Sequence, residues 1–366
     1  MAQIRPFRAY RPCQGMEKRI AALPYDVYNR EEACEVVKKN PDSFLAVDRA
    51  ETQFGEEVDT YADCVYEKAD QLLREKIQEG KFVQDPTPCF YLYELTMDGH
   101  SQTGVVGCAS IDDYRNNVIK KHENTRADKE EDRIRHVDTC SMQTGPIFLA
   151  YRAKEELQNK IGEIKTQTPV YDFVSEDGIE HRVWVISEAA DVAMIEEAFA
   201  KIPAIYIADG HHRCASAVKV GLKRREQHPD YTGEEEFNYF LSVIFPDEEL
   251  QILDYNRVVK DLNGMDVDAF LAAIEEHFMI EKKGRIPYRP EKKGAFGMFL
   301  EDEWYCLTAK KEIRSEDAVE GLDVSLLQNY LLNPVLGIED PKTDKRIDFV
   351  GGIRGLAELE RRVHTD

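Results

Sequence analysis

The sequence predicts an α+β fold with mixed sheets, because strand and helix signals follow one another without the regular strand–helix–strand repeat of an α/β protein. Two β-hairpins are indicated by strand-like runs on either side of Asp98-Gly99 and Asp177-Gly178, since Asp-Gly is a favoured two-residue turn. Apolar residues at helical spacing appear before, between and after these hairpins. Strands and helices are therefore mixed along the whole chain.

The chain of 366 residues is long enough for two domains. The character of the sequence changes near residue 250, so we expect an α+β domain over 1–250 and a smaller α+β domain over 251–366. The 70 acidic residues outnumber the 48 Lys and Arg residues and give a formal net charge of −22. This charge disfavours a nucleic-acid partner or an anionic membrane surface, but it leaves room for a small basic pocket.

The compartment is predicted from what the sequence lacks. Residues 1–10 have no apolar signal-peptide region, and no stretch approaches 18 apolar residues. The 8 cysteines are far apart and include no CxxC pair, so we expect reduced thiols rather than a zinc ribbon. We expect a cytoplasmic protein without a membrane partner, and the sequence leaves its oligomeric state open.

The elements of the first 250 residues follow from local patterns. Asn29 caps a helix to about residue 40, with Glu32 at the capping-box position. A second helix runs from about 58 to 79 and stops at Gly80. The elements expected after it are the first hairpin (89–95 and 105–111), a charged helix (125–140), a strand (145–151), the second hairpin (170–174 and 181–186), a helix (190–201), a strand (204–208), a further helix and a strand (240–245).

Both element types continue after residue 250. The apolar spacing predicts strands over 253–262, 295–300, 304–309 and 346–350, helices over 267–278 and 325–332, and a loop over 282–293.

The pattern most typical of a functional site is Asp209-Gly210-His211-His212-Arg213, between a buried strand and a helix. A tight glycine turn leaves the first amides of the helix without internal partners, and these amides bind anions. The three basic side chains supply donors of the matching sign, and Asp209 is placed to bind a metal or orient a nucleophile. Asp209 could also be a simple helix cap, with the two histidines as ordinary surface residues. No P-loop or GxGxxG pattern occurs.

A second polar segment is Lys120-Lys121-His122-Glu123-Asn124-Thr125-Arg126, in which basic residues flank one carboxylate. As a second wall of a phosphate site, it would use Glu123 as a general base and His122 and Arg126 as phosphate ligands. The alternative is a solvated run of charges with Thr125 capping the next helix.

Two N-terminal turns give secondary candidates, Arg5 in RPFR and Asp26 in LPYDV. Each turn could instead serve only to fix the direction of the chain.

The order RPFRAYRP, LPYDVY, NPDSFL, KKHENT, DGHHR, NPVLGI and RIDFVGG resembles the DUF1015 family over nearly the full length. The strand–DGHHR–helix unit is also similar to the phosphate-binding box of ParB/sulfiredoxin-like domains, and especially of free serine kinases. Asn256 in DYNRVV departs from the family pattern, where we expect His, so a role for that position does not carry over.

The resemblance implies a ParB/sulfiredoxin-like core and a small-molecule kinase, with the catalytic and phosphate-binding functions in the domain over 1–250. Residues 209–213 would form the phosphate box, with His211 and Asp209 in catalysis and Asp209 on Mg²⁺. The donor would be ATP, ADP or pyrophosphate, and the acceptor a hydroxy amino acid such as L-serine. Two alternatives stay open, a ParB-like regulatory protein that binds or hydrolyses nucleotide and a non-catalytic metabolite-binding protein.

Overall fold

The computed structural model describes residues 1–122, 127–317, 319–341 and 343–365. The chain divides into two compact units, Met1–Leu250 and Gln251–Asp366. The first unit contains a large mixed sheet, and the second contains small antiparallel sheets. Helices pack with strands in both units, which confirms the α+β prediction.

The first unit is built on a sheet that has nine strands within the described residues, in the order β6-β10-β7-β11-β5-β4-β9-β8, with β1 added beside β5. Two neighbouring pairs are parallel, β6 with β10 and β7 with β11, and the other pairs are antiparallel. The strands are β1 (Ile4–Arg5), β4 (Phe90–Met97), β5 (His100–Ser110), β6 (Ile119–Lys120), β7 (Ile147–Tyr151), β8 (Tyr171–Val174), β9 (Glu180–Ile186), β10 (Ile205–Asp209) and β11 (Tyr239–Pro246). A separate short pair joins β2 (Tyr10–Pro12) to β3 (Phe82–Gln84).

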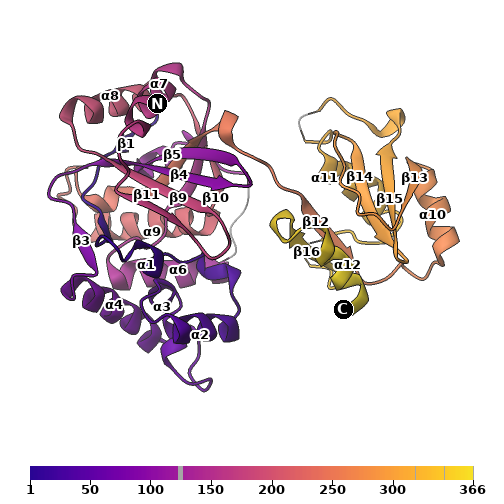
Figure 1. Cartoon of the computed structure of the whole chain (residues 1–366), viewed down its shortest axis with the longest axis horizontal. Helices are drawn as coiled ribbons and strands as arrows, with labels where there is room; N and C mark the ends of the chain where they lie inside the picture. Colours follow the sequence, from indigo (N-terminus) through magenta and orange to yellow (C-terminus); the bar gives the residue numbers. More distant parts are fainter. Residues whose placement is uncertain (123–126, 318, 342, 366) are drawn as a thin grey trace. The chain divides into compact units, whose positions relative to one another are not determined.

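Helices lie on both sides of this sheet. Figure 1 shows α7 and α8 on one side, with α9 and then α6 and α4 on the other. The helices of the unit are α1 (Glu17–Ile20), η1 (Tyr25–Val27), α2 (Arg30–Lys39), α3 (Leu45–Asp48), η2 (Ala50–Gln53), α4 (Asp63–Gln78), α5 (Ile111–Arg115), α6 (Ala127–Cys140), α7 (Glu155–Lys165), α8 (Ala189–Ala200), α9 (His211–Gln227), η3 (Glu236–Asn238) and η4 (Asp247–Glu249).

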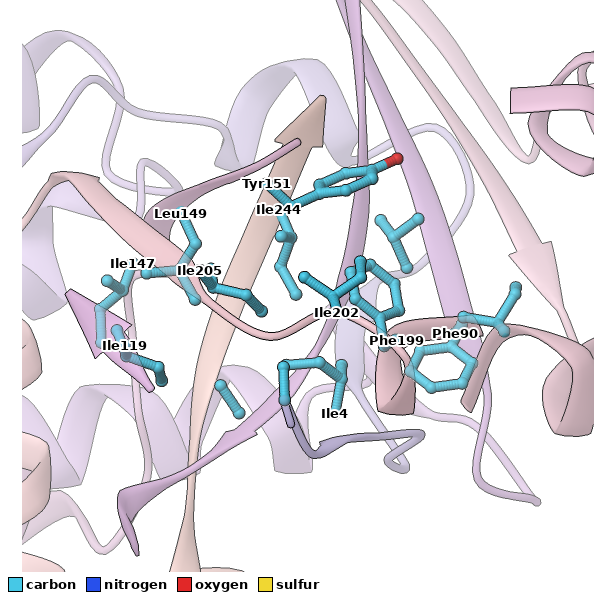
Figure 2. Packing of buried hydrophobic residues seen from close by; sticks show 14 of the residues in the cluster. Ile4, Phe90, Ile119, Ile147, Leu149, Tyr151, Phe199, Ile202, Ile205 and Ile244 are labelled. Atoms are coloured by element: carbon cyan, nitrogen blue, oxygen red, sulfur yellow. The ribbon is translucent and has the colours of Figure 1, made fainter. Parts of the chain in front are cut away.

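The main hydrophobic core lies between the sheet and its helices. Figure 2 shows part of it, where side chains from several strands gather near Phe199 of α8 and Ile202 just after α8. Tyr151 meets Phe199 edge to face, with the ring centroids 5.3 Å apart. This packing holds β7 and β10 side by side, and β10 leads directly into the Gly210 turn.

Local sequence rules explain several elements. Asn29 accepts from the Glu32 backbone amide and Glu32 accepts from that of Asn29, so the predicted capping box is confirmed. Both predicted hairpins form, as β4–β5 and β8–β9. The helix expected from about residue 58 begins only at Asp63, because the residues before it form hydrogen-bonded turns.

The second unit has its own core. Its strands are β12 (Tyr255–Val259), β13 (Phe278–Gly284), β14 (Ala295–Leu300), β15 (Glu303–Ala309) and β16 (Ile347–Gly351), and its helices are α10 (Val267–Glu275), η5 (Lys311–Ile313), α11 (Asp323–Leu327), η6 (Gln328–Leu332), η7 (Gly352–Arg354) and α12 (Leu356–Thr365). The strands pair as β13-β15-β14 and as β12-β16. The loop expected over 282–293 was wrong at its start, because β13 continues to Gly284.

Candidate functional site

The sharp turn between β10 and α9 carries the DGHHR residues. β10 ends at Asp209, Gly210 adopts φ +87° and ψ 33°, and α9 begins at His211. Only glycine reaches this left-handed conformation without steric cost, so the sequence dictates the turn. The first amides of the 17-residue helix α9 therefore open at the end of a sheet strand, where an anion is favoured.

The Arg213 guanidinium folds back over this turn. Its Nη2 donates to Asp209 Oδ2 at 3.1 Å, and its Nη1 donates to the Pro146 carbonyl at 2.8 Å. A Cβ at Gly210 would lie 3.2 Å from Nε and Nη2, and one at Gly145 would lie 3.3 Å from Nη1. The two glycines therefore make room for a cation at the N-terminus of α9.

Two histidines meet beside the turn. The His122 and His211 rings pack edge to face with their centroids 4.4 Å apart. His211 is buried and His122 is exposed, while His212 is partly exposed. β6 and β10 are parallel, so residues that follow them meet at the same edge of the sheet, as the contact between residues 122 and 211 requires. The predicted base Glu123 and the predicted phosphate ligand Arg126 lie outside the described residues.

A cavity of about 240 Å³ is lined mainly by residues with polar or charged side chains. Its wall comes from η1, α3, η2, α4, α6 and the turns before η2 and α4. It consists of Tyr25, Asp26, Asp48, Arg49, Ala50, Glu51, Thr60, Tyr61, Val65, Tyr66, Ala69, Asp132, Arg133 and His136. Thr144 Oγ1 donates to Asp48 in this wall, and Pro146, two residues on, accepts from Arg213 at the turn. The short segment 144–146 thus connects the cavity wall to the Gly210 turn.

The wall carries more carboxylates than guanidinium groups. Its acids are Asp26, Asp48, Glu51 and Asp132, against Arg49 and Arg133. Arg49 pairs with Glu51 and Arg133 with Asp132, so the surplus of negative charge comes from the other two acids. An excess of carboxylates favours a ligand that brings a positive charge into the cavity.

Burial sets the state of the other polar groups in the wall. Burial lowers the pKa of His136, and nearby Arg133 lowers it further, so this imidazole is held neutral. Burial also raises the pKa of Tyr25, whose ring lies 4.0 Å from the Arg133 guanidinium carbon. The nearby Arg133 charge acts in the opposite direction, but burial is the larger effect.

The two secondary candidates lie in different places. Asp26 is part of the cavity wall. Arg5 lies on β1, beside β5, the third strand along from β10, where it pairs with Glu234 and lies over the Tyr239 ring at 4.7 Å. No local sequence pattern singles out Asp48, Glu51, Arg133 or His136, because separate helices bring them together.

Asp209 is the residue that the sequence predicts as a metal ligand. Among the described residues, no three His, Cys, Asp or Glu side chains are grouped closely enough to hold a metal ion. Mg²⁺ in kinases is held by one or two carboxylates together with substrate phosphates and water. The largely exposed Asp209 carboxylate, beside helix amides suited to phosphate, fits that kind of shared site.

The chain belongs to the DUF1015 family, a family of proteins of unknown function, whose family model matches residues 4–325. No curated protein and no solved structure matches the chain. In the described part of the chain, no helix has both the length and the apolar character needed to cross a bilayer.

Proposed function

We propose that this protein is a small-molecule kinase that transfers a phosphoryl group to the hydroxyl of a free amino acid such as L-serine. The observation that carries the proposal is the Gly210 turn at the N-terminus of α9, joined through residues 144–146 to a charged cavity of about 240 Å³. The turn suits a donor phosphate, and the cavity suits a small charged acceptor. Phosphoryl transfer requires that the donor phosphate and the acceptor hydroxyl lie within reach of each other.

The donor phosphate would bind at the turn. The amides at the start of α9 would face its oxygens, with His211, His212 and Arg213 adding donors of positive sign. Mg²⁺, held by Asp209 and the donor, would neutralise charge on the phosphates. ATP, ADP and pyrophosphate all carry the terminal group that this arrangement recognises.

In the transfer step, the acceptor hydroxyl oxygen forms a bond to the terminal phosphorus. The bond from that phosphorus to the bridging oxygen breaks, and the rest of the donor leaves with the electron pair. Glu123 would take the hydroxyl proton, a role that remains a prediction. Arg213 would stabilise the charge that spreads over the transferred group.

The acceptor would lie in the cavity. The surplus of carboxylates favours an ammonium group, and the Arg49 and Arg133 guanidinium groups provide a place for a carboxylate. A zwitterionic amino acid carries both charges. The volume of about 240 Å³ suits a small one.

The finer architecture belongs to the same proposal. The β10–Gly210–α9 unit would be the phosphate-binding part of a ParB/sulfiredoxin-like core. The support is its resemblance to the box of free serine kinases, together with the meeting of His122 and His211 at the parallel β6–β10 pair.

A donor panel tests the activity. The full chain is incubated with Mg²⁺, L-serine and ATP, ADP or pyrophosphate, and phosphoserine is followed by ³¹P NMR. We expect one donor to support turnover, and Asp209→Asn to lower kcat/KM by about 100-fold or more. Asp172→Asn is the matched control, because Asp172 is also an exposed strand residue paired with an arginine, Arg182. No turnover with any donor, or full activity in Asp209→Asn, would overturn the proposal.

An acceptor panel tests the role of the cavity. Ethanolamine keeps the hydroxyl and ammonium of serine, and 3-hydroxypropionate keeps the hydroxyl and carboxylate. Because negative charge is in excess in the wall, we expect the loss of the ammonium to raise KM more than the loss of the carboxylate.

Nucleotide hydrolysis without phosphorylation of any acceptor would instead favour a ParB-like regulatory protein. Amino-acid binding that no donor affects would favour a metabolite-binding protein.

A further inference from the structure

The second unit encloses a cavity of its own, with a volume of about 320 Å³. Its wall is formed by β12, β14, β15, α10, α11, η6 and α12, all between residues 254 and 363. Most of the lining side chains are apolar, including Phe270, Phe296, Met298, Leu300 and Trp304. Protein cores contain few voids larger than a water molecule, whereas small-molecule sites have this volume and this apolar character.

One polar group in the wall lacks a partner. The Asn256 Nδ2 atom is buried and finds no hydrogen-bond acceptor among the described residues. Buried amide donors are paired in the great majority of cases, because an unmade hydrogen bond is costly. A ligand that brings an oxygen acceptor into the cavity would satisfy this donor.

The charges around the cavity indicate the sign of that acceptor. Two of its three carboxylates pair with arginines outside the lining, Asp254 with Arg289 and Asp261 with Arg346. The third, Asp323, accepts from the Gly294 amide.

Arg257 is a charged residue of this wall that has no partner of opposite charge among the described residues. Its guanidinium carbon lies 5.3 Å from the Tyr255 and Phe349 rings, and burial lowers its pKa. A half-buried cation without a carboxylate partner is stabilised by an anion, so a carboxylate fits the site better than a neutral carbonyl group does.

We infer that the second unit binds a small carboxylic acid with an apolar body, such as a short-chain fatty acid or an arylalkanoic acid. The body fills the apolar cavity, and the carboxylate accepts from the Asn256 amide in the field of Arg257. This inference does not depend on the proposed kinase activity, because every residue that it uses belongs to the second unit.

Trp304 gives a direct measurement of binding, because it lines the cavity and the sequence has 2 tryptophans, the other being Trp184. The full chain carrying Trp184→Phe therefore reports on this cavity alone. It is titrated with hexanoate, 1-hexanol and hexylamine, which share one apolar body and differ in charge. We expect saturable binding of hexanoate with a Kd near or below about 1 mM, binding of 1-hexanol at least about 10-fold weaker, and weakest binding of hexylamine.

Two variants of the Trp184→Phe protein test the contact between the ligand carboxylate and Asn256. Asn256→Asp keeps the size of the side chain but places a negative charge beside the ligand, so we expect at least about 10-fold weaker binding of hexanoate. Asn329→Asp is the control, because Asn329 lies on η6, donates to Glu320 and does not line the cavity. Far-ultraviolet circular dichroism confirms that each variant is folded. No saturable change with any compound, equal affinity for all three, or unchanged hexanoate binding in folded Asn256→Asp would overturn the inference.

Discussion

Among single residues, Gly210 has two structural roles. Its positive φ makes the turn from β10 into α9, and its missing side chain leaves room for the Arg213 guanidinium. Gly178 has only the first role, the positive φ of a turn, because its φ is +83° and a Cβ there would meet nothing within 4 Å. A comparison of alanine substitutions at Gly178 and Gly210 therefore separates the cost of backbone strain from the cost of displacing Arg213.

We predict that Gly178→Ala lowers the free energy of unfolding of the first unit by about 1 kcal/mol, the cost of a left-handed alanine. Gly210→Ala should cost more, and it should also weaken pyrophosphate binding because Arg213 is displaced. Urea unfolding followed by Trp184 fluorescence measures the first effect, and titration calorimetry measures the second. Equal unfolding free energies with unchanged pyrophosphate affinity would contradict this role of Gly210.

His136 predicts a pH dependence of stability. Burial lowers its pKa in the folded chain below the ordinary value of 6.5, so the unfolded chain binds the extra proton. The stabilisation is complete above pH 6.5 and falls as the pH drops toward the folded pKa, by up to about 1.4 kcal/mol per pH unit. His181, whose pKa burial also lowers, acts in the same direction.

His136→Asn should therefore flatten the plot of unfolding free energy against pH below pH 6.5. His181→Asn should remove only its own share of the slope. The relevant quantity is the slope, because the substitution of a buried side chain also lowers stability at every pH. A slope unchanged by His136→Asn would show that this imidazole does not resist protonation.

At the scale of elements, α9 is held between its neighbours by close backbone approach. A Cβ at Gly221 would lie 2.4 Å from the Phe237 carbonyl oxygen and 2.9 Å from Ile111 Cδ1. Gly162 of α7 is also a helical glycine, but a Cβ there would meet nothing within 4 Å. The same substitution should therefore have opposite effects in the two helices.

We predict that Gly162→Ala raises the unfolding free energy by up to about 1 kcal/mol, because alanine favours the helix. Gly221→Ala should lower it by about 2 kcal/mol or more, because a carbonyl oxygen of the backbone must move. Trp184 fluorescence during urea unfolding reports both variants. A stabilising Gly221→Ala would mean that η3 does not lie against α9 in solution.

At the scale of the whole molecule, each unit has a separate hydrophobic core and one tryptophan. Ile274 of α10 is completely buried in the core of the second unit. Ile274→Ala should lower the unfolding free energy of that unit by about 2 to 5 kcal/mol.

Trp304 should report this loss in a Trp184→Phe background. Trp184, in a Trp304→Phe background, should report an unfolding midpoint that Ile274→Ala does not change. If both tryptophans reported the same shift, the two units would unfold together.

What the sequence could predict follows from how far apart the interacting residues are. The Asn29 capping box, the Asp-Gly hairpins and the Gly210 turn depend on neighbours within a few residues, and each forms as expected. The cavity depends on five helical segments between residues 25 and 136, so no local pattern indicates it. The contact of His122 with His211 requires the pairing of β6 with β10, which only the folded sheet establishes.

The position of β11 in the sheet has a consequence for how the protein is made. β11 lies between β7 and β5, so it joins the group β6-β10-β7 to the group β5-β4-β9-β8 with β1. It is also the last strand of this sheet to leave the ribosome. The 243 residues from Ile4 to Pro246 take about 12 to 50 s to synthesise, and until then the edges of β7 and β5 that later bind β11 are unpaired. The nascent chain is therefore most exposed to aggregation just before β11 emerges, and chaperone protection would matter most at that stage.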